Sequence, residues 1–304
     1  MKKNIVRFAS ILLAASLLLP SGALASTGSS SSGNAINEKF GMPIVVYGAD
    51  LTEAEKQSVK DSLKVTSESE VEEISVTGED LVKYIKDGDS KARMFSSAKI
   101  TREDAGKGLV INIVTEENIT QVTAEMYENA MLTAGIEDAT VEVAAPKKVT
   151  GHSALVGIYK AYEVSGETLD KERTDVANEE LSVATILADK SGIDEAKVSE
   201  LLTEIKKDIA EQNPATKEEV EKIVQDQLTK LQIELNPEDR QLLIDLMDRI
   251  RQLDIDFSKW SDQLNDLSKT LEDKIGNIVD NEGFWQSVKN FFNNLIDSLR
   301  SLFN

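Results

Sequence analysis

The chain has 304 residues, no cysteine and a formal net charge of −20 at pH 7. Its length is sufficient for two ordinary domains, and the absence of cysteine excludes thiol catalysis, disulfide bonds and thiolate metal sites. The excess of acidic residues excludes nucleic acid as a partner, because such a chain repels the phosphate backbone as well as anionic lipid headgroups.

The N-terminus has the three parts of an export signal. A cationic start precedes a mostly apolar run of twelve residues from Phe8 to Leu19, and Ala23 and Ala25 are the small residues that signal peptidase recognises. We predict a signal peptide over residues 1–25, cleaved between Ala25 and Ser26, and a mature protein secreted to the exterior or the cell envelope. The alternative is an uncleaved anchor, although the apolar run is shorter than the roughly 20 residues that span a bilayer.

Residues 26–39 are rich in Ser and Gly, which predicts a disordered linker. From residue 40 to residue 165, apolar runs of strand length alternate with helical patterns, which predicts an α/β domain. The expected strands are residues 43–47, 71–77, 98–101, 109–114 and 139–143. The third and fourth strands are joined through Gly106-Lys107-Gly108, so we expect them to form a central hairpin that makes the sheet mixed.

Helix signals in this domain are local and specific. Thr52 and Glu55 have the spacing of a capping box and predict a helix that reaches Leu63. A short helix is expected across residues 81–85, and a further helix from Thr123 to Ala134, where Gly135 would end it.

Residues 166–304 contain no further run of strand type and are predicted to be entirely helical, with amphipathic helices at the C-terminus. Asn213-Pro214 is expected to end one helix and Thr216 to cap the next. Asn236-Pro237 is a strong start signal, because it combines a capping side chain with Pro at the first helical position. The predicted fold class is therefore mixed α/β, or α+β: a mixed-sheet N-terminal domain followed by an all-helical region.

His152 is the single histidine, and Ser153 follows it directly. A nucleophile elbow would have glycine where Leu155 stands, and a base adjacent in sequence to its nucleophile is poorly placed for triad geometry. We interpret Thr150 or Ser153 as the N-cap of a helix.

The segment from Asp254 to Ser258 resembles the opening of a calcium loop. However, Lys259 stands at the position of the required glycine and Asn265 at that of the liganding glutamate. Paired acids are so frequent in this chain that none can be singled out as a glycosidase pair. We therefore predict no catalytic residue, no cofactor and no metal site.

The C-terminal region has one apolar seam with alternating spacings of three and four residues, which is typical of helix–helix packing. Its members are Phe257, Trp260, Leu264, Leu267, Leu271, Ile278, Trp285, Val288, Phe292, Leu295, Leu299 and Leu302. Only Lys274 and Asn281 interrupt it, close to Gly276 and Gly283, which predicts two helices separated by a break. The seam is expected to pack within its own bundle, to bind a partner or a second copy, or, less favourably, to lie on a membrane surface.

Several short strings of the sequence are similar to a known family. They are Gly48-Ala49-Asp50-Leu51-Thr52, Met126-Tyr127-Glu128-Asn129-Ala130, Thr133-Ala134-Gly135-Ile136, Ala144-Ala145-Pro146 and Lys160-Ala161-Tyr162-Glu163-Val164. Together they resemble the YpuA-like family of secreted Gram-positive proteins, also called domain of unknown function 1002. The resemblance implies an extracytoplasmic protein of the cell envelope and brings no catalytic residue with it. Our leading hypothesis is an envelope-associated, non-enzymatic binding or structural protein; the alternative is a carboxylate-dependent hydrolase of cell-wall polymers.

Overall fold

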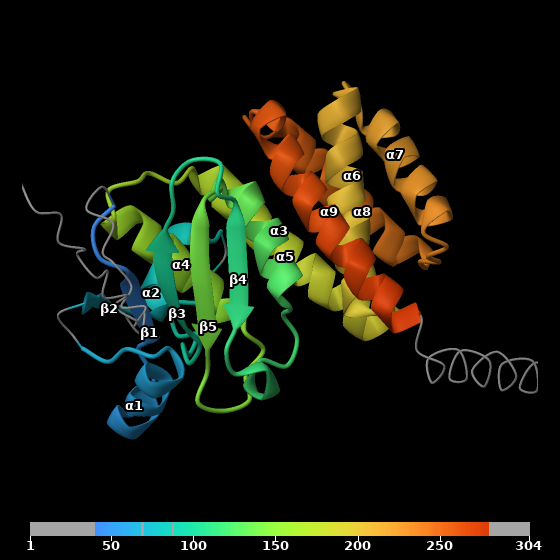
Figure 1. Cartoon of the computed structure of the whole chain (residues 1–304). Coiled ribbons are helices and arrows are strands. Elements are labelled where there is room, and N and C mark those ends of the chain that lie inside the picture. The colour runs from blue at the N-terminus through green and yellow to red at the C-terminus, as the bar shows by residue number, and fades with distance from the viewer. Residues whose placement is uncertain (1–39, 68–69, 87, 280–304) are drawn as a thin grey trace, which may run out of the picture. The chain divides into compact units, whose positions relative to one another are not determined.

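The computed structural model describes residues 40–67, 70–86 and 88–279. A mixed sheet forms the centre of the first half of the chain, and helices make up the rest (Figure 1). The strands are β1 (Ile44–Gly48), β2 (Glu72–Val76), β3 (Ser97–Arg102), β4 (Leu109–Ile113) and β5 (Ala139–Ala144). The helices are α1 (Glu53–Ser62), α2 (Gly78–Tyr84), the 3-10 turn η2 (Glu116–Asn118), α3 (Ala124–Ala134), α4 (His152–Val164), α5 (Lys171–Ser191), α6 (Glu195–Gln212), α7 (Lys217–Lys230), α8 (Pro237–Gln252) and α9 (Phe257–Val279). The predicted fold class is confirmed.

The strand order of the five-stranded sheet is β2-β1-β3-β5-β4. β1 pairs with β2 in parallel and β4 with β5 in parallel, while β3 is antiparallel to both β1 and β5. The sheet is thus mixed, but the expected hairpin of β3 and β4 is wrong, because β5 lies between them (Figure 1).

The burial of the two strands explains this order. The first four residues of β3 are buried, as expected of a strand with neighbours on both sides, whereas β4 has alternating exposed and half-buried residues and forms an edge. Instead of a tight turn, residues 103–108 make a wide connection. It is held by Asp138, whose carbonyl accepts from the Glu103 N–H at 3.1 Å and whose carboxylate accepts from the Gly108 N–H at 2.8 Å.

Helices α3 and α4 cover one face of the sheet, and α1 covers part of the other. Val46, Ala98 and Val141 point into the main core beneath α3 and α4. Val45 and Tyr47 point the opposite way, to a smaller core with Val59 and Leu63 at α1. The alternation along β1 therefore supplies both cores from one strand.

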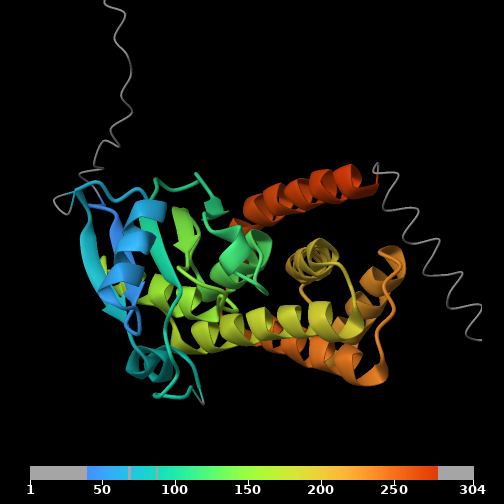
Figure 2. The same ribbon diagram turned by 90° about the horizontal axis from the view of Figure 1, so that it is seen from below.

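The later helices pack onto the sheet-bearing half through α3. α5 contacts α3 and α8, and α6 contacts α5, α7 and α9 (Figure 2). The main core is continuous from Ile44 in β1 to Leu264 in α9. Within the described residues, no helix is both long and apolar enough to cross a membrane.

Most of the predicted helix ends are found where the local signals place them. Thr52 and Thr216 form complete capping boxes, Asn236 caps α8 with Pro237 in its first turn, and Gly135 ends α3 in the left-handed conformation. Asn213 likewise ends α6 with φ of 46°.

One prediction about a helix end is wrong. The N-cap of α4 is Gly151, with φ of 106° and no capping side-chain hydrogen bond, and not Thr150 or Ser153. α9 continues past Gly276 to Val279, so no break lies at Gly276; Gly283 lies outside the described residues, and a break between two C-terminal helices stays a prediction.

Candidate functional site

Several loops meet at one edge of the sheet. β1, β2, β4 and β5 run in the same direction, so their carboxyl ends share this edge with the start of the antiparallel β3. α4 also begins here, because it follows β5 after a short loop. The carboxyl edge of parallel strands is where open α/β sheets commonly bind ligands.

A cavity of about 360 Å³, here called the α4 cavity, lies at this edge beside the first turn of α4. Its lining residues are Leu81, Ala92, Arg93, Met94, Phe95, Ser96, Val149, Thr150, Gly151, His152, Ser153 and Asn178. The lining is mostly apolar and contains Arg93 and His152 but no Asp or Glu, although the chain has 54 acidic residues. Two other cavities of the described residues each have acidic side chains in their lining, whereas the α4 cavity has a cationic group and neutral polar groups but no carboxylate.

The loop before β3 is fixed to the end of β1. The Met94 N–H donates to the Asp50 carboxylate at 2.7 Å, and the Asp50 N–H donates to the Met94 carbonyl at 3.1 Å. A side chain at Gly48 would be 2.3 Å from that same carbonyl, so glycine is needed for this close approach. The loop thereby holds Arg93 and Ser96 in defined places at the cavity.

Gly151 is buried at the opposite wall. Its carbonyl accepts from the Tyr127 hydroxyl at 2.6 Å, and a Cβ at this position would be 2.8 Å from that hydroxyl. The positive φ and the lack of space together require glycine, which places His152 and Ser153 in the first turn of α4.

His152 and Ser153 do not form a nucleophile–base pair. The Ser153 hydroxyl accepts from the Ser96 N–H at 3.2 Å, and burial lowers the pKa of His152. Within the described residues, no hydrogen bond joins the two side chains and no carboxylate orients the imidazole. This arrangement lacks the geometry of a charge-relay system.

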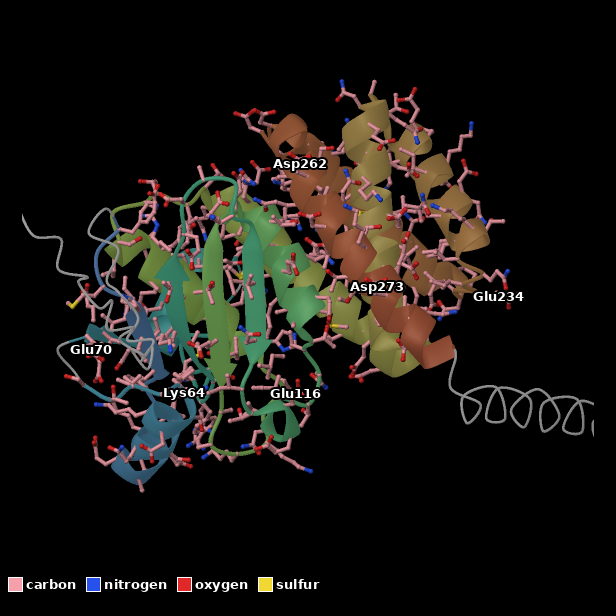
Figure 3. All side chains as sticks on the ribbon, in the orientation of Figure 1. Lys64, Glu70, Glu116, Glu234, Asp262 and Asp273 are labelled. Atoms are coloured by element: carbon pink, nitrogen blue, oxygen red, sulfur yellow. The ribbon has the colours of Figure 1, made fainter. Side chains whose placement is uncertain are left out.

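Acidic groups are dispersed elsewhere. The exposed residues Glu70, Glu116, Glu234, Asp262 and Asp273 are spread over the molecule, with Asp262 and Asp273 at separate places along α9 (Figure 3). In the part of the chain that the structure describes, no group of three or more His, Asp or Glu side chains could hold a metal ion.

Two further cavities contain carboxylates. A cavity of about 400 Å³ between β4 and the start of α3 has Glu116 and Glu195 in its lining. A cavity of about 370 Å³ has Asp175 and Glu179, but Glu179 forms an ion pair with Arg249, and Asp175 accepts from the Lys86 N–H. The acids of this last cavity are thus engaged in structural contacts.

The interior between α3, α5 and α6 contains what we call the buried polar network: Asn129, Thr133, Glu180, Thr203 and Lys206. The Lys206 ammonium is 2.8 Å from the Glu180 carboxylate, and both side chains are almost completely buried. Thr133 also donates to Glu180, and Lys206 donates to the Asn129 carbonyl at 3.0 Å. Burial lowers the pKa of Lys206, while Glu180 opposes that effect.

The seam residues of α9 that the structure describes pack inside the chain itself. Trp260 and Leu264 belong to the main core, and Leu267 and Leu271 pack with Ala196 of α6. The remaining residues of the predicted interface, Trp285, Val288, Phe292, Leu295, Leu299 and Leu302, lie outside the described residues, as do Ala25 and Ser26. Their roles stay predictions.

Sequence reasoning missed Arg93, Ser96 and the pair Glu180–Lys206. The pair carries a signal, because each residue occupies the apolar stripe of its helix: Glu180 beside Ala177 and Ala184, Lys206 beside Leu202 and Ile209. Arg93 and Ser96 have no comparable signal, since they lie in an irregular loop.

Comparison with known proteins agrees with the resemblance seen in the sequence. A family model described as "Protein of unknown function (DUF1002)" matches residues 47–267. The "Uncharacterized protein YpuA" of Bacillus subtilis (strain 168) is 37% identical over 267 residues, which cover 86% of this chain and 87% of that protein. No solved structure is significantly similar to the chain. The matched span begins in β1 and ends in α9, so it includes the α4 cavity.

Proposed function

We propose that this chain, which belongs to the DUF1002 family of proteins of unknown function, is a secreted, non-enzymatic binding or structural protein of the cell envelope. In this proposal the α4 cavity binds a ligand. The C-terminal helices make a second contact, either with a protein partner or with another copy of the chain.

The lining of the α4 cavity is the observation that carries the proposal. Its convergent polar groups are Arg93, Ser96, His152 and Asn178, which are suited to holding a ligand by hydrogen bonds. A carboxylate-dependent hydrolase would need two acids on opposite sides of a bound substrate. The lining has neither, so its chemistry supports recognition over hydrolysis.

Export is supported by the sequence of residues 1–25, which has the order of a cationic start, an apolar run and a small-residue cleavage pattern. The strong negative charge supports solubility and argues against binding to anionic lipid headgroups.

The partner contact is supported by the continuation of the seam beyond α9. Trp260, Leu264 and their neighbours pack against the chain's own helices, and the same spacing continues to Trp285 and Phe292. An amphipathic segment of this type binds another helix or, less favourably here, a lipid surface.

Protein purified from the culture supernatant of a producing host tests the proposal. Mass spectrometry is expected to show a chain that starts at Ser26, and the protein is expected to co-sediment with purified cell walls without releasing soluble fragments. Release of wall fragments would favour the hydrolase, and recovery only of full-length, membrane-bound chain would contradict export. As an internal check, H152A and S153A are expected to leave any wall-degrading activity within a few-fold of wild type.

A further inference from the structure

α4 is the one helix among α1–α8 that has no side-chain cap. The other seven begin with a Thr, Asp or Asn whose side chain accepts from a backbone N–H of the first turn. α4 has 13 residues and begins at Gly151, which has no side chain to offer. The positive end of its dipole is therefore not covered by a capping oxygen, and it faces the α4 cavity.

Ser96 provides an independent observation at the same place. Its side chain is 1% exposed, and its hydroxyl has no hydrogen-bond partner in the described part of the chain. Ser96 lies directly before β3 in the wall of the α4 cavity, and its N–H donates to the Ser153 hydroxyl at 3.2 Å, so Ser96 adjoins the first turn of α4. A buried hydroxyl without a partner costs free energy, and a bound group that accepts its hydrogen bond would recover it.

The local charge also favours an anion. Arg93 lines the cavity, and its side chain is 69% exposed, with the guanidinium 3.6 Å from the Asp50 carboxylate. This is a loose ion pair, from which the guanidinium can turn toward a bound oxyanion with which it forms paired hydrogen bonds. His152 adds a ring N–H donor in the first turn of α4.

From these observations we propose that the α4 cavity binds an oxyanion, a phosphate or carboxylate group, between the first turn of α4, the Ser96 hydroxyl and Arg93. The volume of about 360 Å³ and the apolar side chains of Leu81 and Met94 fit a small organic group attached to that anion. This inference rests on the proposed binding function and specifies its ligand chemistry.

Inorganic phosphate and acetate serve as probes, and His152 reports on the site because it is the only histidine of the chain. We expect saturable shifts of the His152 ring-proton resonances at millimolar concentrations of at least one probe. R93Q is expected to weaken binding about tenfold and S96A about fivefold. R240Q, which removes the same charge from α8, is the matched control and should bind like wild type.

Equal affinities of wild type, R93Q and S96A would overturn the proposal, as would shifts that sodium chloride reproduces at the same ionic strength. R93Q alters an exposed side chain, so it tests the site even if S96A fails to fold. Co-sedimentation with cell walls is measured on the same samples. Wall binding without phosphate or acetate binding would overturn this inference and leave the proposed function standing; the reverse result would contradict the proposed function and support the anion site.

Discussion

Two regions of the molecule differ in how fully their buried polar groups are hydrogen-bonded. In the buried polar network, Lys206 and Glu180 form an ion pair, Thr133 donates a further hydrogen bond to Glu180, and Lys206 donates one to the Asn129 carbonyl. At the α4 cavity, the Ser96 hydroxyl has no partner among the described residues, and the first turn of α4 has no cap. Unmet hydrogen-bonding capacity beside an open cavity is characteristic of a binding site, whereas a satisfied network mainly fixes the packing of helices.

The network also has a structural consequence for the whole chain. It joins α3 of the sheet-bearing half to α5 and α6, and the Lys206 ammonium is 5.7 Å from the centre of the Trp260 ring in α9. A change at this point should therefore affect stability strongly, while changes at the cavity should affect mainly ligand binding.

The largest loss is expected for K206M. The substitution leaves the Glu180 carboxylate buried without its cation, which typically costs about 3–5 kcal/mol of the free energy of unfolding. Urea denaturation measures the loss. K217M is the matched control, because Lys217 forms an ion pair with Asp245 in which both side chains are nearly half exposed, and such exposed pairs contribute little to stability. Similar losses in the two variants would show that the buried Lys206–Glu180 pair contributes no more to the free energy of unfolding than an exposed ion pair does.

A comparable loss is expected for W260A. Trp260 is completely buried, and truncation of a buried Trp to Ala costs about 3–5 kcal/mol. Thermal unfolding of W260A and wild type measures this loss.

Thermal unfolding of W285A, together with flotation on uncharged liposomes, tests the part of the seam that lies outside the described residues. A loss of stability equal to that of W260A would mean that the packed seam continues to Trp285. An unchanged melting temperature together with lost flotation would mean that this segment binds membranes.

The elements that sequence alone located are those whose signals are local. Thr52, Thr216 and Asn236 cap helices with side chains that reach only three residues along the chain, so their spacing is sufficient evidence. The strands were likewise visible as short apolar runs. These features need no knowledge of distant partners.

The features that sequence did not locate depend on distant partners. β5 pairs with both β3 and β4 and so separates them, and this pairing joins residues about 30 to 47 positions apart, which no local pattern records. The start of α4 at Gly151 depends on Tyr127 and Ile119, which occupy the space of a side chain. Ser96 is significant only because no partner is within reach, and an absence of this kind has no sequence pattern.

A pH-dependent loss of stability is expected from Glu128. Burial and the neighbouring Glu125 raise the pKa of Glu128 from 4.5 to about 8, although Lys206 opposes the shift. The folded state thus binds this proton more tightly than the unfolded state does, so the stabilisation is complete below about pH 4.5 and is lost as the pH rises through about 8. Between pH 6 and pH 9, wild type should lose about 3 kcal/mol that E128Q does not lose. Urea denaturation of wild type and E128Q at pH 6 and at pH 9 measures the two changes in the free energy of unfolding. Equal changes in the two proteins would disprove the raised pKa of Glu128.

The smallest expected change in stability comes from removing the Ser96 hydroxyl at the α4 cavity. Comparing it with removal of the Thr203 hydroxyl in the buried polar network tests the difference between the two regions directly. The Thr203 hydroxyl donates to the Ser199 carbonyl at 2.8 Å and lies 3.3 Å from the Asn129 Oδ1. The Asn129 Nδ2 keeps the Glu125 and Ser199 carbonyls as acceptors, but T203V removes the partner of the buried Oδ1 and should therefore cost about 1–3 kcal/mol. Ser96 has no partner to lose and its unsatisfied hydroxyl costs free energy, so S96A should not lower the free energy of unfolding in buffer without added anions. Adding phosphate should then raise the melting temperature of wild type and of T203V, because a ligand that binds only the folded state stabilises it, and should raise that of S96A less. A large loss for S96A in the absence of anions would mean that its hydroxyl already has a partner, and the contrast between the cavity and the network would no longer hold.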